Sequence, residues 1–154
     1  MQVSKFGGAS VRNADGLRNL CGIVESLDKP LVVVVSAMGK MTNAFETLAG
    51  YYFAGEQEAL ANQYQCIRQY HESVISDLFG TFELVALEPF FQLLDELDDR
   101  LKKKPSMDFD FEYDQIVSFG ELLSTRVVSA YLDWAGMKNQ WVDVRYVLKT
   151  DDLY

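Results

Sequence analysis

The chain has 154 residues, of which 49% are apolar and 24% charged, and its formal net charge is −9. This length suits one globular domain of ordinary soluble composition. The negative charge argues against a nucleic-acid or anionic-membrane partner, because both need clustered Lys and Arg.

The N-terminal part of the sequence predicts a strand, a helix and a second strand. Val3 to Phe6 is short and stops at a Gly-Gly pair, as a strand does before a tight turn. Leu17, Leu20, Val24 and Leu27 then follow a helical spacing, with Ser10 or Asn13 available as the N-cap. The run Leu31–Val35 is β-branched and does not alternate, which predicts a strand of a parallel sheet covered on both faces.

The middle of the chain predicts three amphipathic helices. The first runs from Thr42 to about Ala54 and ends at Gly55, and the second covers residues 56–79 and ends at Gly80. His71, the only histidine, falls on the apolar face of the second helix, so we expect it in the core. A third helix extends to Leu101, with Pro89 in its first turn.

The last third predicts a linker, a long helix and one or two strands. Residues 104–108 form the linker, and residues 111–134 are helical by spacing but interrupted at Gly120. Residues 141–144 and 146–148 have the apolar pattern of strands. The fold class is therefore α/β, with helices outnumbering strands.

The cysteines and the apolar runs bear on location. Cys21 and Cys66 lie in helical patterns and fit neither a disulfide framework nor a metal pair, so we expect reduced thiols. The longest apolar run is too short for a signal peptide or a membrane span. We therefore expect a cytoplasmic protein without a membrane partner.

Two glycine-containing loops follow the first two predicted strands. Ligands of open parallel sheets bind outside the carboxyl ends of the strands, which is where these loops lie. Gly7 and Gly8 would let backbone amides approach an anion, and Lys5 could neutralise a phosphate. The alternative is a plain tight turn with an exposed lysine. The P-loop and dinucleotide-binding patterns are both absent from the two loops.

Four ordered blocks resemble the aspartate kinases of the amino acid kinase superfamily. The first three blocks resemble the family's KFGGTSV opening, its VVSA run leading to G-x-T-N, and its [SH]-x-G-E-x-[LM]-S block. The fourth resembles D-x-R followed by T-[DN]-D. In this chain they are residues 5–11 (with Ala9 in place of the family's Thr), 34–43, 118–125, and 143–145 with 149–152.

The resemblance implies a fold and a domain organisation. Residues 1–154 would be the N-terminal half of an amino acid kinase (carbamate kinase-like) domain, with a parallel-rich sheet flanked by helices and a helical insertion at about residues 43–104. Relatives continue into a nucleotide-binding half and ACT regulatory domains. We therefore expect a truncated chain, inactive alone, from a parent that forms homo-oligomers.

The resemblance also implies roles for single residues. Lys5, Gly7 and Gly8 would contact the ATP phosphates, with Ser10 a candidate to replace the hydroxyl lost at Ala9. Substrate L-aspartate would contact residues of the second and third blocks: Ser36, Thr42 and Glu121. The reaction would transfer phosphate from ATP with Mg²⁺, and we expect no metal ligands from the protein. It would open lysine, threonine and methionine biosynthesis.

Two other functions stay open on the sequence. The chain could belong to another amino acid kinase, such as a glutamate 5-kinase or a carbamate kinase relative. It could also be a non-catalytic regulatory module that kept the fold.

Overall fold

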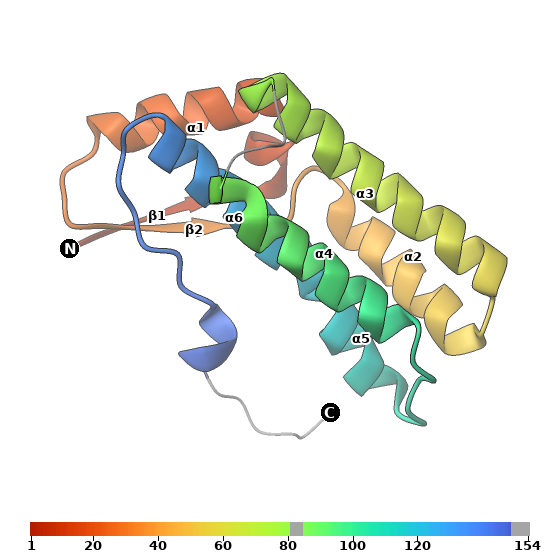
Figure 1. Ribbon diagram of the computed structural model, residues 1–154. Helices are drawn as coiled ribbons and strands as arrows, with labels where there is room; N and C mark the ends of the chain where they lie inside the picture. Colours follow the sequence, from red (N-terminus) through yellow and green to blue (C-terminus); the bar gives the residue numbers. More distant parts are fainter. Residues whose placement is uncertain (81–84, 149–154) are drawn as a thin grey trace.

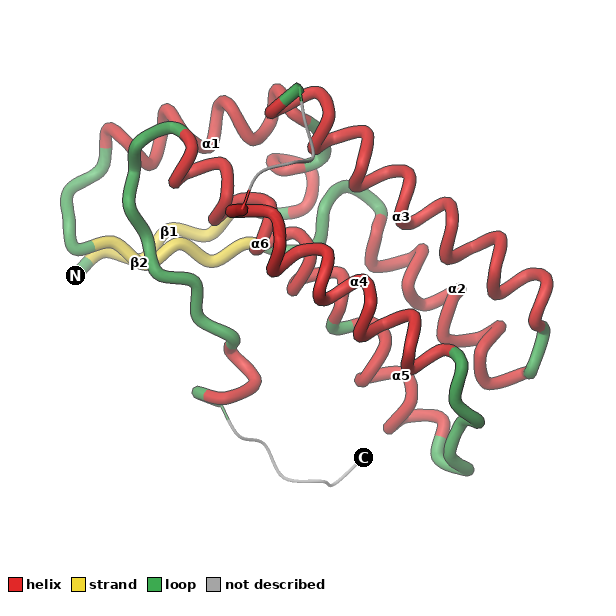
Figure 2. Tube along the Cα trace, viewed as in Figure 1, coloured by secondary structure: helices red, strands yellow, loops and turns green. Residues whose placement is uncertain are grey.

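The computed structural model describes residues 1–80 and 85–148, and these residues form an α/β structure that is mostly helical. Figures 1 and 2 show the two strands side by side at one end of the molecule, with one helix alongside them and most of the others extending away. The elements, in chain order, are β1 (Gln2–Phe6), η1 (Gly8–Val11), α1 (Ala14–Ser26), β2 (Leu31–Val35), α2 (Met41–Ala54), α3 (Gln57–Phe79), η2 (Val85–Leu87), α4 (Glu88–Leu101), α5 (Phe109–Val117), α6 (Phe119–Trp134) and η3 (Val144–Tyr146).

The first three predicted elements are confirmed. β1 and β2 pair in parallel, in a register that places Phe6 opposite Val35. Helix α1 connects them, and its N-cap is Asn13, whose side chain accepts a hydrogen bond from the Gly16 amide at 3.0 Å. Because parallel strands end at the same edge, the loops that follow β1 and β2 start side by side.

One prediction about the sheet is wrong, because β2 is not covered on both faces by the described residues. Val35 is 6% exposed, whereas Val32 and Val34 are 43% and 44% exposed. Successive side chains of a strand point to opposite faces, so Leu31, Val33 and Val35 face the core and the other two valines face outward. Over the residues described, the helices cover one face of this sheet.

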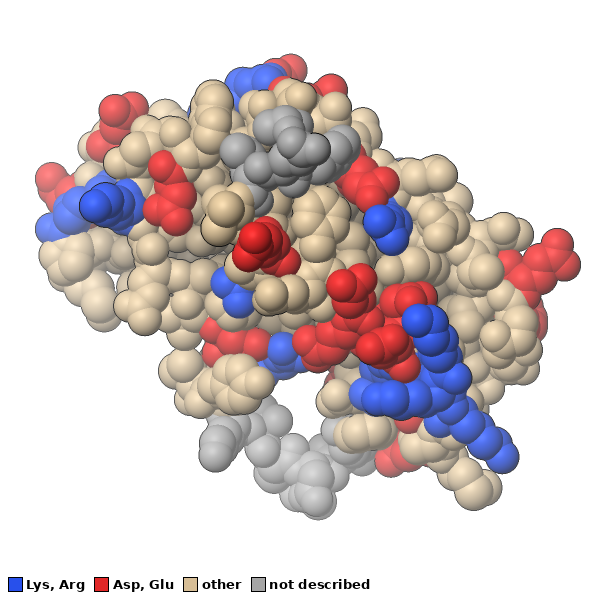
Figure 3. Space-filling model, in the orientation of Figure 1, with Lys and Arg blue, Asp and Glu red and all other residues tan. Residues whose placement is uncertain are grey.

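The predicted ends of the middle helices are confirmed. α2 and α3 end at Gly55 and Gly80, which take left-handed conformations with φ of +73° and +68°. Pro89 lies in the first turn of α4. The acidic residues of α4 lie mainly on its solvent side, and Figure 3 shows acidic side chains gathered on that surface. Lys102 pairs with Asp98 at 2.5 Å just past the helix end.

The last third differs from the prediction in two places. The helix breaks at Ser118, between α5 and α6, while Gly120 lies inside the first turn of α6. Residues 141–148 form no strand; they run as loop and the short helix η3, whose N-cap is Asp143. Lys149, Thr150, Asp151 and Asp152 of the fourth block lie outside the described residues.

Helix α6 runs through the centre of the molecule, next to β2 on one side and to α4 on another (Figure 1). A single core of buried apolar side chains extends from Phe6 of β1 to Leu132 of α6, with His71 fully buried beside it, as predicted. No helix in the described part of the chain has both the length and the apolar character needed to cross a membrane.

Candidate functional site

The loops after β1 and β2 are hydrogen-bonded into one unit. The Ser36 amide donates to the Phe6 carbonyl at 3.1 Å, which extends the pairing of the strands by one step. The Gly39 amide then donates to the Gly8 carbonyl at 2.9 Å. The two predicted glycine loops therefore form a joined edge at the carboxyl ends of the strands, where ligands of parallel sheets bind.

Lys5 places a cation at this edge. Its side chain is exposed, and its ammonium donates to the Ser36 hydroxyl at 3.4 Å. The contact is long for a hydrogen bond, so it orients the ammonium weakly and leaves it able to meet an anion. Two sequence-predicted residues, Lys5 near the end of β1 and Ser36 of the second loop, are thus in contact.

The two neighbouring glycines of the first loop have different surroundings. A Cβ at Gly8 would lie 2.6 Å from the Ala37 carbonyl oxygen and 3.0 Å from that of Gly39. A Cβ at Gly7 would meet nothing within 4 Å. Gly8 is therefore required for the close approach of the two loops, whereas the space beside Gly7 is open.

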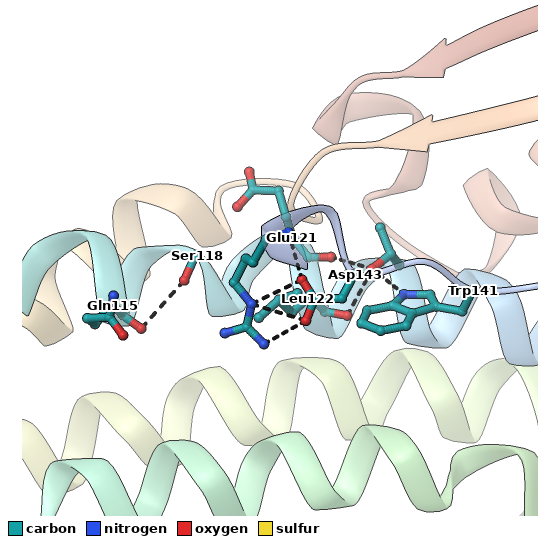
Figure 4. A network of polar contacts seen from close by, with 8 residues as sticks. Gln115, Ser118, Glu121, Leu122, Trp141 and Asp143 are labelled. Carbon is teal, nitrogen blue, oxygen red and sulfur yellow. Dashed lines mark hydrogen bonds and ion pairs between the residues drawn. The ribbon is translucent and has the colours of Figure 1, made fainter. Parts of the chain in front are cut away.

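Glu121 joins the site from the first turn of α6. Its carboxylate oxygen Oε1 accepts a hydrogen bond from the Ala37 amide at 3.3 Å. Figure 4 shows this side chain pointing from α6 toward the loops beyond the strands. Gly120 allows the approach, since a Cβ there would lie 3.1 Å from that of Ala37 and 3.3 Å from the Phe45 ring.

Ser124 is a site residue to which the sequence analysis gave no role. Its hydroxyl is fully buried and donates to the Ser36 carbonyl at 2.8 Å. Ser124 lies three residues after Glu121, so both point from the same face of α6. Its position three residues after Glu121, within the third matched block, is the sequence feature that could have indicated its role.

Two predicted residues are not joined to the others by the contacts seen among the described residues. Ser10 is exposed in η1, where its amide donates to the Gly7 carbonyl at 2.9 Å. Thr42 is exposed in the first turn of α2, directly after the second loop. Both flank the joined edge, and their roles stay predictions.

The segment after α6 is held against that helix near the site (Figure 4). The Trp141 indole N–H donates to the Thr125 hydroxyl at 2.9 Å, and Thr125 donates to the Glu121 carbonyl at 2.8 Å. The Arg126 guanidinium lies 3.4 Å from the Trp141 ring centroid. These contacts fix Trp141 beside the helix that carries Glu121.

Asp143 and Arg145 form a bidentate pair in the same segment, with a shortest distance of 2.7 Å. Burial would raise the pKa of the Asp143 carboxyl, but hydrogen bonds from the Arg145 side chain and amide hold that pKa below its ordinary value. The pair is therefore ionised at neutral pH, and it closes the turn of η3.

The site thus combines a lysine at the end of β1, two glycine-containing loops at the carboxyl ends of parallel strands, and a glutamate of α6 that approaches them. This defines an α/β protein whose strand ends are suited to an anionic ligand. The particular family follows from residues 1–153, which match the model of the amino acid kinase family. The chain belongs to that family, as its four blocks predicted.

Curated relatives of the chain are aspartokinases. It is 32% identical to aspartokinase 1, chloroplastic, of Arabidopsis thaliana, over 97% of this chain and 27% of that protein. It is 30% identical to lysine-sensitive aspartokinase 3 of Escherichia coli K12, over 99% of this chain and 33% of that protein. The chain thus spans about a third of the length of these relatives.

Solved structures of E. coli aspartokinase III have the same fold. The complex with aspartate and ADP matches with a TM-score of 0.80 at 29% identity, covering 99% of this chain and 33% of that chain. The complex with lysine and aspartate matches with a TM-score of 0.83 at 31% identity over the same shares. These matches confirm the predicted amino acid kinase fold.

Proposed function

We propose that this chain supplies the aspartate-binding part of an aspartate kinase and the portion of its phosphate site around Lys5. The reaction converts ATP and L-aspartate into ADP and 4-phospho-L-aspartate. The observation that carries the proposal is the joined edge, where Lys5, both glycine loops and Glu121 meet in a chain similar to an aspartokinase that was solved with aspartate and ADP.

The geometry suits transfer of phosphate to a carboxylate. The Lys5 ammonium and the amides around Gly7 and Gly8 stabilise charge on the phosphoryl oxygens, with Ser10 beside them. The acceptor carboxylate is already ionised, so no general base is needed. Transfer then depends on position and charge neutralisation.

Glu121 is the group that binds the substrate ammonium. The Ala37 amide holds one oxygen of its carboxylate, which fixes the direction of the side chain. Ser36 and Thr42 lie on the second loop and at the start of α2, where they contact the remaining polar atoms of L-aspartate. A charge-assisted pair at Glu121 would supply much of the affinity.

In this proposal Mg²⁺ binds together with the nucleotide. Among the described residues, no group of three or more His, Cys, Asp or Glu side chains is placed to hold a metal ion. Mg²⁺ is commonly held by substrate phosphates with few protein ligands, so the ion arrives as MgATP. We place the activity in the cytoplasm, in an oligomeric parent, at the start of lysine, threonine and methionine biosynthesis.

Binding of L-aspartate to the chain tests the proposal, because the residues proposed to contact the amino acid, Ser36, Thr42 and Glu121, all lie in this chain. Isothermal titration should show binding of L-aspartate in preference to L-glutamate. Glu121→Gln should weaken it by about tenfold or more, the effect of losing a charged hydrogen bond. The control Glu25→Gln removes an exposed carboxylate of α1 and should leave the affinity unchanged.

Two results would overturn the assignment. Preference for L-glutamate would favour a glutamate 5-kinase. Absence of binding by either amino acid, with the chain folded, would favour a non-catalytic module.

A further inference from the structure

Tyr70 reaches the joined edge from helix α3, outside the elements that carry the predicted site residues. Its hydroxyl donates to the Arg12 carbonyl, which lies between η1 and α1 at the end of the first loop. The phenol ring is half-buried and meets the His71 ring edge to face, with centroids 5.5 Å apart. The ring is therefore fixed, and its hydroxyl ends between two loops.

The second loop passes close to the same hydroxyl. A Cβ at Gly39 would lie 2.8 Å from the Tyr70 hydroxyl oxygen and 3.5 Å from the Cβ of Arg12. Gly39 has φ of +55°, and its amide donates to the Gly8 carbonyl. One oxygen atom of α3 thus lies where the end of the first loop meets the second loop.

The position of α3 is itself fixed against α1. The Arg18 guanidinium donates to the Asp77 carbonyl near the end of α3 at 2.5 Å, and α1 also packs against α3 (Figure 1). Burial raises the pKa of the Tyr70 phenol, so the hydroxyl stays a donor at neutral pH. Tyr70 can therefore act as a rigid support.

We propose that Tyr70 is a positioning residue, whose hydroxyl holds the first loop and the second loop at the spacing that ligand binding requires. This inference rests on the proposed function for the identity of the ligands. The effect of the Tyr70 hydroxyl on the spacing of the two loops does not depend on which ligands bind. Without the hydroxyl, the Gly8–Gly39 hydrogen bond opens more often, and the Ala37 amide no longer holds Glu121 in one direction.

The experiment compares Tyr70→Phe with Tyr64→Phe in the full chain. Tyr64 lies on the same helix, and its hydroxyl also donates to a backbone carbonyl, that of Leu94 at 3.2 Å, away from both loops. Each variant keeps its ring and loses its hydroxyl group. Amide hydrogen exchange of Gly39 and titration with L-aspartate are the two readouts, and thermal unfolding records general stability.

The two variants should fold with similar losses of stability. In Tyr70→Phe the Gly39 amide should exchange roughly fivefold faster or more, and the Kd for L-aspartate should rise by a similar factor. Tyr64→Phe should change neither the Gly39 exchange nor the Kd. If Tyr70 only stabilised the fold, the two variants would have similar effects on both readouts.

The outcomes separate this inference from the proposed function. Unchanged Gly39 exchange in Tyr70→Phe would overturn the support, and faster exchange with an unchanged Kd would overturn the positioning role. Equal acceleration in both variants would also overturn it. If the wild-type chain binds no L-aspartate while Tyr70→Phe alone speeds Gly39 exchange, the support stands and the proposed function fails.

Discussion

At the scale of single residues, the Gly7-Gly8 pair shows how two identical neighbours take different roles. Gly7 has φ of −76° and ψ of 165°, which any residue adopts, and a Cβ there would meet nothing within 4 Å. Gly8 faces the backbone of the second loop, and the carbonyl oxygens there cannot move without opening the joined edge. Glycine is therefore sterically required at position 8 and not at position 7.

Gly8→Ala should separate the loops. Its Cβ would lie 2.6 Å from the Ala37 carbonyl oxygen, so the free energy of unfolding should fall by about 1–3 kcal/mol. Urea unfolding followed by circular dichroism measures this change. Gly7→Ala is the matched control and should stay within about 0.5 kcal/mol of wild type. Equal effects of the two substitutions would contradict the packing role of Gly8.

At the scale of elements, the sequence predicts helix ends well where a glycine closes them and poorly where packing decides. Gly55 and Gly80 end α2 and α3 as predicted. Gly120 looked like an interruption, but it serves the close approach of α6 to Ala37. A glycine within a helical pattern indicates either a break in the helix or a close approach of another segment, and only the segment packed against it in the folded chain distinguishes the two.

The wrongly predicted strands of residues 141–148 have a related cause. Val142, Val144 and Val147 give the apolar pattern, but a strand also needs a pairing partner, and none is present among the described residues. The Asp143 side chain instead accepts a hydrogen bond from the Arg145 amide at 2.9 Å and closes a turn. Side-chain contacts with the backbone compete with strand formation in this way.

Glu112 joins α4 and α5 across the observed connection between them, residues 102–108, which contains the predicted linker. Its side chain is buried; it accepts a hydrogen bond from the Ser106 amide at 2.7 Å and pairs with Arg100 of α4 at 3.0 Å. Burial would raise the pKa of this carboxyl, but these bonds hold it below the ordinary value. The linker is thus fixed by one carboxylate from α5.

Glu112→Ala should lower the free energy of unfolding by about 2–3 kcal/mol, since it leaves the Ser106 amide and Arg100 without their acceptor. Glu72→Ala removes the partner of Arg68 on the more exposed surface of α3 and should cost less than about 1 kcal/mol. Urea unfolding of both variants compares the two costs. A Glu112 cost no larger than that of Glu72 would show that the linker is held by other contacts.

At the scale of the whole molecule, the order of elements and the joined loops follow from local patterns. Parallel pairing of β1 and β2 places Lys5 near the second loop, and the matched blocks add Glu121. The contacts of Ser124 and Tyr70 come from helices far along the chain, so local spacing gives no distance for them. The run of β-branched residues in β2 does not show whether both faces are covered, because coverage depends on which layers pack against the sheet.

The core gives the whole molecule a pH dependence through one residue. His71 is fully buried between apolar side chains, and its Nδ1 lies 2.8 Å from the Ile67 carbonyl, so the neutral ring donates there. Its Nε2 is buried without a hydrogen-bond partner among the described residues. Burial lowers the pKa of His71 from 6.5 to about 4, partly opposed by the bond to Ile67.

The free energy of unfolding should therefore fall as the pH is lowered from 6.5 toward 4. In that window the unfolded chain binds a proton at His71 that the folded chain excludes. Between pH 7 and pH 5 the loss from this residue should be about 2 kcal/mol, measured by urea unfolding at each pH.

His71→Phe isolates this effect, because it keeps an aromatic ring against Phe90 and removes the titrating group. Its absolute stability can differ from wild type, so the slope with pH is the readout. Both proteins carry the same carboxylates, so the difference between their slopes reports on residue 71. A slope as steep in His71→Phe as in wild type would show that another group carries the pH dependence.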